Sequence, residues 1–261
     1  MAIKSILVVM SGAAGEEVRL KEAFTLAARH GAAIAALHVK PTPALYVGSP
    51  GMEMPVAIIE SQQREIDRTA EAVEAAVKAE AGKAGVAVEW RSEEGDEIAV
   101  AGIHARYADL VVASPDVARD LVFSSASPVL AFPDGAKPAA PKRVLIAWNG
   151  SREAARAVRD ALPLIEAAAT ASVLVVDQPA GQSIGTDLGR ALAHHGIKVE
   201  VNERVSGGAD IGTILLEEAR TSGAELLVMG AYGHSRFREW VLGGATELAL
   251  SEAKIPVLLS H

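Results

Sequence analysis

The chain of 261 residues is long enough for one or two domains with hydrophobic cores. Half of its residues are hydrophobic but only 4% are aromatic, so the interior must consist mainly of Ala, Val, Leu and Ile, as in parallel sheets covered by helices. The absence of cysteine excludes disulfides and thiolate chemistry. The net charge of −8, with its acidic excess in the first half and no basic stripe, argues against a nucleic-acid partner.

The beginning of the chain carries no recognisable targeting signal. Residues Met1–Ser5 lead directly into the apolar run Ile6–Met10, which leaves no separable signal peptide. No stretch of about 18 consecutive apolar residues occurs, so no membrane-spanning helix is expected. We therefore expect a cytoplasmic protein without a membrane partner.

A long helical pattern follows the second predicted strand, Ala33–Val39. It covers Ile58–Lys83, and its apolar residues Ile59, Ile66, Val73 and Val77 recur at helical spacing with charged residues opposite. Core packing is the simplest interpretation of this stripe. The preceding segment 41–55 is rich in Pro and Gly and could be a lid or a partner loop; the sequence leaves this choice open.

The second half of the chain repeats the first, and this repeat decides the fold. Three pairs of segments match: Ile6–Gly12 with Val144–Gly150, Ala108–Ser114 with Ala224–Gly230, and Pro128–Phe132 with Pro256–Ser260. In each copy, strands alternate with helical patterns. This alternation predicts a five-stranded parallel sheet with helices on both faces, an α/β fold of the Rossmann-like kind.

The stretch between the copies is rich in Pro, Ala and Gly, a composition typical of linkers. We assign residues 1–134 to the first domain, 135–141 to a linker and 142–261 to the second domain. In such sheets, ligands bind beyond the carboxyl ends of the strands, where the strand order reverses.

The most informative motif is a glycine loop, residues 230–246, that follows the apolar run Leu226–Met229. Gly230, Gly233 and the Gly243-Gly244 pair allow backbone N–H groups to approach an anion, and a helix expected to begin near Gly244 would direct its positive end toward the same point. We interpret the loop as a phosphate site; a glycine-rich surface turn is the alternative.

The first half carries no such loop. At the equivalent place it lacks about 12 residues, and what remains, 115–127, contains no glycine. We therefore expect the first half to have lost nucleotide binding. On this interpretation, disrupting residues 115–127 should leave nucleotide affinity nearly unchanged.

The spacing Gly-x2-Gly-x9-Gly resembles the nucleotide loop of universal stress proteins, small α/β domains of which many bind ATP. The resemblance extends over essentially the whole chain and is to the tandem type, with an adenine nucleotide alpha hydrolase-like fold. Family members usually have Ser or Thr directly after the last glycine of the pattern. Here Gly244 occupies that place, and the nearest hydroxyl belongs to Thr246.

The resemblance implies a site for ATP or another adenine nucleotide, with or without Mg²⁺, in the second domain. Adenine would pack near Ala147 and Val176, and the ribose would lie near Asn149, where the family usually has an Asp. The implied nucleotide-binding residues are Ala147, Trp148, Asn149, Val176, Met229, Gly230, Gly233, His234, Gly243, Gly244, Ala245 and Thr246. No catalytic residue and no metal ligand is assigned.

Simpler interpretations of several of these residues stay open. Asn149 could be present only because Asn is favoured in turns, and Val176 could be an ordinary core residue. His234 is favoured as a plain polar loop residue over a phosphate donor or an acid/base group. The segment Ser206–Asp210 resembles the loop of ATP pyrophosphatases, but it follows the third strand and is expected to cap a helix beginning near Ile211.

Three functions remain in competition at this stage. The favoured one is a nucleotide-binding regulatory protein in stress responses; the others are a slow ATPase and a module that binds no nucleotide and acts only through protein contacts. From the resemblance we also expect the two halves to pack as a pseudo-dimer, with Pro128–Phe132 beside Pro256–Ser260. A homodimer of whole chains is a further possibility.

Overall fold

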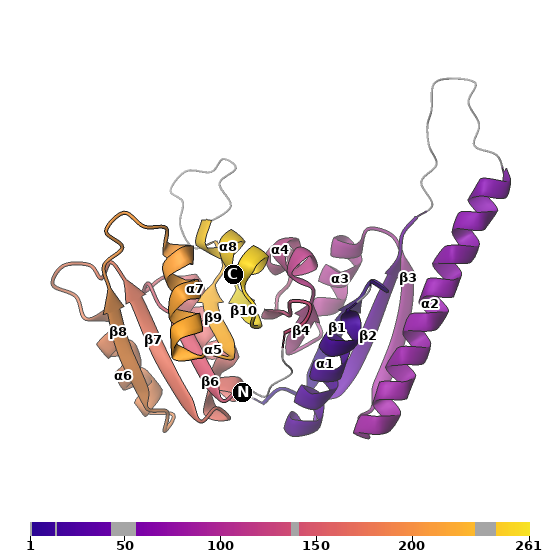
Figure 1. The fold of residues 1–261 in the computed structure, drawn as a ribbon. Helices are drawn as coiled ribbons and strands as arrows, with labels where there is room; N and C mark the ends of the chain where they lie inside the picture. The colour runs from indigo at the N-terminus through magenta and orange to yellow at the C-terminus, as the bar shows by residue number, and fades with distance from the viewer. Residues whose placement is uncertain (1, 14, 43–55, 137–140, 233–243) are drawn as a thin grey trace.

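The structure is a computed structural model that describes residues 2–13, 15–42, 56–136, 141–232 and 244–261 (Figure 1). The first half contains β1 (Ser5–Met10), α1 (Glu16–His30), β2 (Ala33–Lys40), α2 (Val56–Ala84), β3 (Val88–Glu94), α3 (Glu97–Ala105), β4 (Leu110–Ala113), α4 (Pro115–Ser124) and β5 (Val129–Ala131). The second contains β6 (Arg143–Ala147), α5 (Arg152–Glu166), β7 (Thr170–Val176), α6 (Ile184–Ala193), β8 (Val199–Arg204), α7 (Ile211–Ser222), β9 (Leu226–Gly230), α8 (Gly244–Glu252) and β10 (Val257–Ser260). The alternation in both halves agrees with the predicted α/β fold.

The strands form one ten-stranded sheet in the order β3-β2-β1-β4-β5-β10-β9-β6-β7-β8. Within each half all pairs are parallel, and the same order, 3-2-1-4-5 in local numbering, occurs twice. The exception is at the centre, where β5 and β10 pair antiparallel with Leu258 opposite Leu130. The expected pairing of the two last strands is therefore confirmed.

Two helices cover each face of the sheet in each half. Val8 and Met10 of β1 belong to a buried cluster with side chains of α1 and α2, whereas Leu7 and Val9 belong to a second cluster with side chains of α3 and α4. Successive side chains of a strand point to opposite faces, so strands covered on both faces must be apolar throughout. The central strands, such as β4, are accordingly buried at every position.

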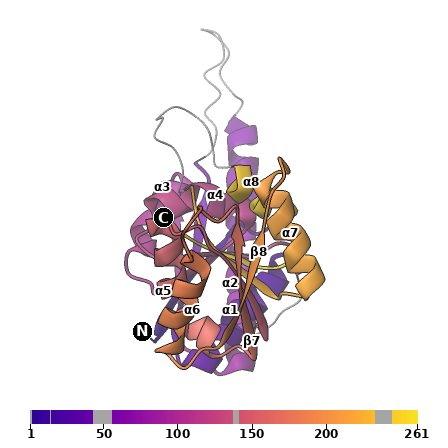
Figure 2. The ribbon, with the colours of Figure 1, turned by 90° about the vertical axis from the view of Figure 1, so that its left-hand side faces the viewer.

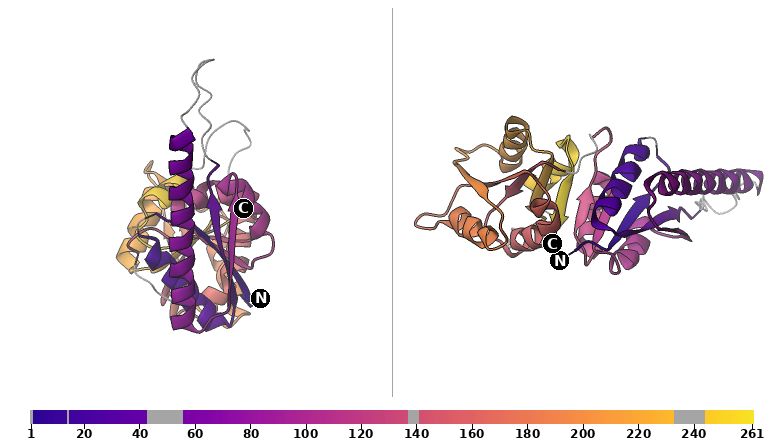
Figure 3. Two further views of the ribbon diagram at one scale, coloured as in Figure 1. Left: turned by 90° about the vertical axis from the view of Figure 1, so that its right-hand side faces the viewer. Right: turned by 90° about the horizontal axis from the view of Figure 1, so that it is seen from below.

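Helix α2 is 29 residues long, compared with 10 in its counterpart α6. The stripe expected from the sequence is buried at Val73 and Val77, which pack against the core, while Ile59 and Ile66 are only partly buried. The helix lies at the outer edge of the first half, and its amino-terminal end projects past the sheet (Figures 1 and 3). Residues 43–55, most of the segment interpreted as a lid or partner loop, lie outside the described residues.

Side-chain caps fix the beginnings of several helices at the carboxyl ends of strands. Ser151 Oγ accepts the Ala154 N–H at 3.1 Å at the start of α5, and Asp210 Oδ1 accepts the Thr213 N–H at 3.1 Å at the start of α7. The expectation that Asp210 caps a helix beginning near Ile211 is confirmed. None of the described helices combines the length and the apolar character that crossing a bilayer requires.

The central strand pair gives a prediction about stability. Leu258 is fully buried at the junction of the two halves. Leu258→Ala should lower the free energy of unfolding by about 2–4 kcal/mol, since the smaller side chain leaves a cavity that the two β-strands cannot close. Urea unfolding measures the change.

The matched control is Tyr107→Ala, because the Tyr107 side chain is 80% exposed. This variant should change the free energy of unfolding by no more than about 0.5 kcal/mol. Equal effects of the two substitutions would contradict the placement of Leu258 at a packed junction.

Candidate functional site

A cavity of about 560 Å³ opens at the carboxyl ends of β6, β7 and β9, between the sheet and helices α7 and α8. Figure 2 shows the second half, which carries it, facing the viewer. The volume is within the range of small-molecule and cofactor pockets. The position is the one where open parallel sheets bind ligands, because the chain leaves neighbouring strands in opposite directions there.

One wall of the cavity is apolar. It is formed by residues from the ends of three strands and from α7: Ala147, Leu174, Val176, Met229 and Leu215. Ala147 and Val176 are partly exposed although the three residues before each of them are buried, which leaves their side chains available to a ligand. A flat apolar ring could therefore be buried here without displacing core residues.

The structure brings most of the predicted site residues to this one cavity. Those that line it are Ala147, Trp148, Asn149, Val176, Met229, Gly230, Gly244, Ala245 and Thr246. The remaining three, Gly233, His234 and Gly243, lie outside the described residues. Tyr232 and Gly244, on either side of that segment, both line the cavity.

Asn149 and Trp148 also have local structural roles. Asn149 Oδ1 accepts the Ser151 N–H at 3.0 Å, a turn that sets the entry into α5. Trp148 Nε1–H donates to the Ile184 carbonyl oxygen at 3.0 Å and so ties the end of β6 to the start of α6. The turn that the sequence offered as an alternative for Asn149 is present, and the residue lines the cavity as well.

The glycines at the two ends of the glycine loop have different local surroundings. A Cβ atom at Gly230 would collide with the backbone of Glu153 and Ala154, so close packing of β9 against α5 requires glycine there. At Gly244 an added Cβ would lie 3.8 Å from Asp210 Oδ2, the one near contact among the described residues. Gly244 lines the cavity, and the first N–H groups of a helix have no carbonyl partner within the helix.

Thr246 and Tyr232 connect those two ends. The Tyr232 N–H donates to Thr246 Oγ1 at 3.4 Å, and Thr246 is 3% exposed. Tyr232 has a φ of 56°, a left-handed conformation that is uncommon for a side chain of this size. Burial raises the pKa of Tyr232 to about 12, and Glu247 contributes in the same direction, so the phenol stays protonated near neutral pH.

Two aspartates at the cavity were not singled out as ligand-binding residues by the sequence analysis. Asp177 directly follows β7 with a φ of 54°, and its carboxylate accepts the Ser206 N–H at 2.8 Å; hydrogen bonds from Ser206 lower the pKa of Asp177. Asp210 is the cap of α7. Asp177 directly follows β7 and Asp210 directly precedes α7, two elements that border the switch point. This position in the sequence is the signal that could have identified both residues.

In the first half, the backbone N–H groups that follow β1 are hydrogen-bonded to a carboxylate of the same half. Ser11 N–H and Gly12 N–H, which follow β1, donate to the Glu16 carboxylate at 2.9 Å each, and Ser11 Oγ donates to it at 2.6 Å. Arg19 pairs with the same carboxylate at 2.7 Å. Thr69 of α2 lies directly over Gly12. These contacts occupy the backbone donors at the place where Asn149 and Gly150 follow β6 in the second half.

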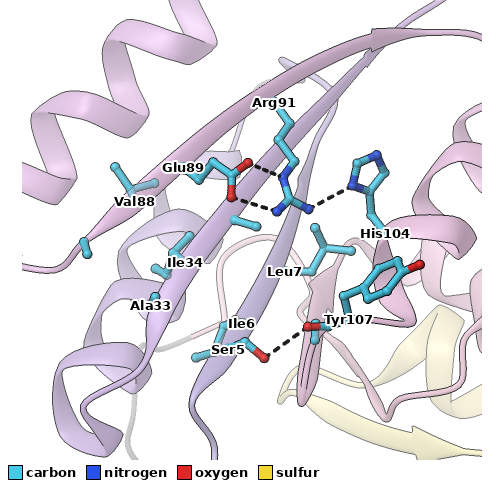
Figure 4. Close-up of a pocket in the computed structure, with 13 residues that line it drawn as sticks. Ser5, Ile6, Leu7, Ala33, Ile34, Val88, Glu89, Arg91, His104 and Tyr107 are labelled. Atoms are coloured by element: carbon cyan, nitrogen blue, oxygen red, sulfur yellow. Dashed lines mark hydrogen bonds and ion pairs between the residues drawn. The ribbon is translucent and has the colours of Figure 1, made fainter.

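A second cavity, of about 300 Å³, lies in the first half at the amino-terminal ends of β1, β2 and β3 (Figure 4). Arg91 makes two hydrogen bonds to Glu89, at 3.0 and 2.8 Å, and a third contact of 2.9 Å to His104 Nδ1. The bonded Arg91 lowers the pKa of Glu89. Because Glu89 already neutralises this guanidinium, and the cavity lies at the opposite end of the strands, it does not fit the phosphate site predicted from the sequence.

Comparison with known proteins agrees with the two-fold repeat. The model of the universal stress protein family matches residues 2–115 and again residues 141–261. A universal stress protein from Synechocystis sp. is 39% identical over 69 residues, which is 26% of this chain and 23% of that relative. The alignment therefore spans about a quarter of the curated relative's length.

Solved structures of similar fold extend over nearly the whole chain. A universal stress protein from Archaeoglobus fulgidus DSM 4304 has a TM-score of 0.75 with 17% identity, covering 98% of this chain and 95% of its own. A functionally unknown protein from Pseudomonas aeruginosa PAO1 has a TM-score of 0.61 with 18% identity, covering 99% and 92%. The double match to the family model, together with the repeated α/β fold, places this chain in the universal stress protein family.

Proposed function

We propose that residues 142–261 bind ATP or another adenine nucleotide, and that the chain acts as a nucleotide-responsive regulatory protein of stress responses in the cytoplasm. The observation that carries the proposal is the cavity at the carboxyl ends of β6, β7 and β9. It combines an apolar wall with residues of the first turn of α8, the two surfaces that a base and a phosphate need.

The proposed binding mode follows from the lining. Adenine packs against Ala147 and Val176, and the ribose lies near Asn149. The phosphates accept hydrogen bonds from the first turn of α8, beginning at Gly244, where backbone N–H groups and the helix dipole favour negative charge. Gly233, His234 and Gly243 belong to this proposal on the sequence pattern alone.

The residues present would fit a magnesium ion only in part. Asp210 is a carboxylate near Gly244 that lines the cavity, and its Oδ1 is engaged as the α7 cap. It could supply one oxygen ligand through Oδ2. Mg²⁺ takes six oxygens and usually keeps several waters, so the phosphates and water would have to supply the rest.

We propose that the protein binds the nucleotide rather than hydrolyses it, because the described carboxylates at the cavity are engaged in hydrogen bonds. Hydrolysis requires a general base to activate water. Asp177 and Asp210, which line the cavity, both accept hydrogen bonds from the backbone and fix local structure. A regulatory protein needs only that the occupied state differ in stability from the empty one.

The direct test is to denature freshly purified protein and identify any released nucleotide by liquid chromatography and mass spectrometry. We expect about one adenine nucleotide per chain, because, within the part of the chain that the structure describes, the cavity at the carboxyl ends of the strands and helix α8 beside it both belong to the second half. If none is released, titration calorimetry with Mg-ATP, ADP, AMP and cyclic AMP follows. No binding of any of these would overturn the proposal, and two nucleotides per chain would overturn the assignment of a single site.

The apolar wall gives a prediction about affinity. Ala147→Leu adds three carbon atoms at the place proposed for adenine, so it should weaken nucleotide binding by at least about tenfold, a change of about 1.4 kcal/mol. Calorimetry measures the dissociation constant. Ala72→Leu, the same change on the exposed face of α2, is the control and should leave affinity unaltered. Unchanged affinity in a folded Ala147→Leu protein would place the ligand elsewhere.

Asn149 gives a second prediction, for a substitution that should strengthen nucleotide binding. Asn149→Asp keeps the oxygen that accepts the Ser151 N–H and adds a charged acceptor for the ribose hydroxyls. Affinity should rise about three- to tenfold, since charge-assisted hydrogen bonds are roughly twice as strong as neutral ones. Asn149→Ala, which loses both interactions, should bind more weakly than the natural protein. An Asp variant that binds no better than the Ala variant would exclude a ribose contact at this position.

A further inference from the structure

We propose that helix α4 of the first half positions the nucleotide site of the second half. This inference rests on the proposed function and assigns a role to the half that is expected to bind no nucleotide. It rests on Phe123 and Arg119, two side chains of α4 that contact the two described ends of the glycine loop.

The first contact is at the beginning of the loop. The Phe123 ring stacks on the Tyr232 ring with a centroid distance of 4.5 Å and an interplanar angle of 26°. Tyr232 lines the cavity, and its backbone is in the left-handed conformation. Holding a large side chain in that conformation requires support from its surroundings, and the stacked ring supplies it.

The second contact is at the other end of the loop. Arg119 Nε lies 3.0 Å from the Glu247 carboxylate, in the first turn of α8, and Arg119 also pairs with Asp116 at 3.2 Å on its own helix. Helices α4 and α8 pack against each other in the centre of the molecule (Figure 1). The Arg119–Glu247 ion pair therefore helps to orient α8. The backbone N–H groups in the first turn of this helix are the proposed hydrogen-bond donors to the phosphates.

The two contacts belong to one connected set. Tyr232 N–H donates to Thr246 Oγ1 at 3.4 Å, so the residue that Phe123 supports is bonded to the helix that Arg119 supports. Phe123 also makes an edge-to-face contact of 5.2 Å with His261, whose Nδ1 lies 3.1 Å from the Ala231 carbonyl oxygen. A site whose donors are already held in place loses less entropy when the ligand binds.

None of the α4 residues lines the cavity itself. They act through Tyr232 and α8, which makes them positioning residues. From the sequence, disruption of residues 115–127 is expected to leave nucleotide affinity nearly unchanged; the contacts of α4 lead to the opposite expectation. By linkage, nucleotide binding must in turn strengthen the contact between the halves.

The test compares full-length variants by titration calorimetry with Mg-ATP. Phe123→Ala and Arg119→Ala should each weaken binding about fivefold or more, in line with the loss of one aromatic pair or one partly buried ion pair. Phe123→Tyr keeps the stacked ring and should restore affinity. Tyr107→Ala removes an exposed aromatic from the same half without contact to α8 and should bind like the natural protein.

A second readout separates positioning from a general loss of stability. In the natural protein, Mg-ATP should slow hydrogen exchange of the α4 amides, although α4 does not touch the cavity. In Phe123→Ala this slowing should disappear. Circular dichroism checks that each variant is folded without ligand; if Phe123→Ala is not, Phe123→Leu retains apolar volume and removes the ring.

The outcomes are distinguishable. If the natural protein binds no adenine nucleotide, the proposed function is overturned and this inference with it. If the natural protein binds but the folded variants bind equally well and α4 exchange is unaffected by Mg-ATP, the proposed function stands and the positioning role of α4 is overturned.

Discussion

The antiparallel pairing of β5 with β10 is the interaction on which the arrangement of this molecule depends. It converts two separate five-stranded sheets into one and fixes the position of the elements that flank the junction. Because α4 precedes β5 and α8 precedes β10, the pairing brings these helices together. Three pairs of residues in register, Val129 to Ala131 against Val257 to Leu259, thus place α4 beside α8.

The two halves share one fold but satisfy the donors at their strand ends in different ways. In the first half, the Glu16 carboxylate accepts the N–H groups that follow β1, and Arg19 balances its charge. A buried carboxylate with several backbone donors is a stable arrangement that needs no ligand. In the second half, the space beyond the strands is a cavity, and the start of α8 faces it. The two halves also differ in length, because α2 has 29 residues and its counterpart α6 has 10.

The sequence predicted the features that depend on pattern, and it missed those that depend on tertiary contact. The repeat predicted the alternation of strands and helices in both halves, the resemblance implied the pairing of the last strands, and the glycine spacing predicted a helix beginning near Gly244. The left-handed Tyr232 and its stacking on Phe123 carry no local signal, because the partners are more than a hundred residues apart. Likewise, only the structure reveals that close packing of β9 against α5 requires glycine at position 230.

The ten-stranded sheet ends in β3 on one side and β8 on the other. Both outer strands carry several charged side chains, among them Glu89, Arg91 and Glu93 on β3 and Glu200, Glu203 and Arg204 on β8. Charges on an edge strand discourage the addition of a strand from another molecule. The last strands, which could otherwise pair two identical chains, are already paired within one. We therefore expect any homodimer of this protein to associate through helices or loops, and lengthening of the sheet into a fibre is disfavoured.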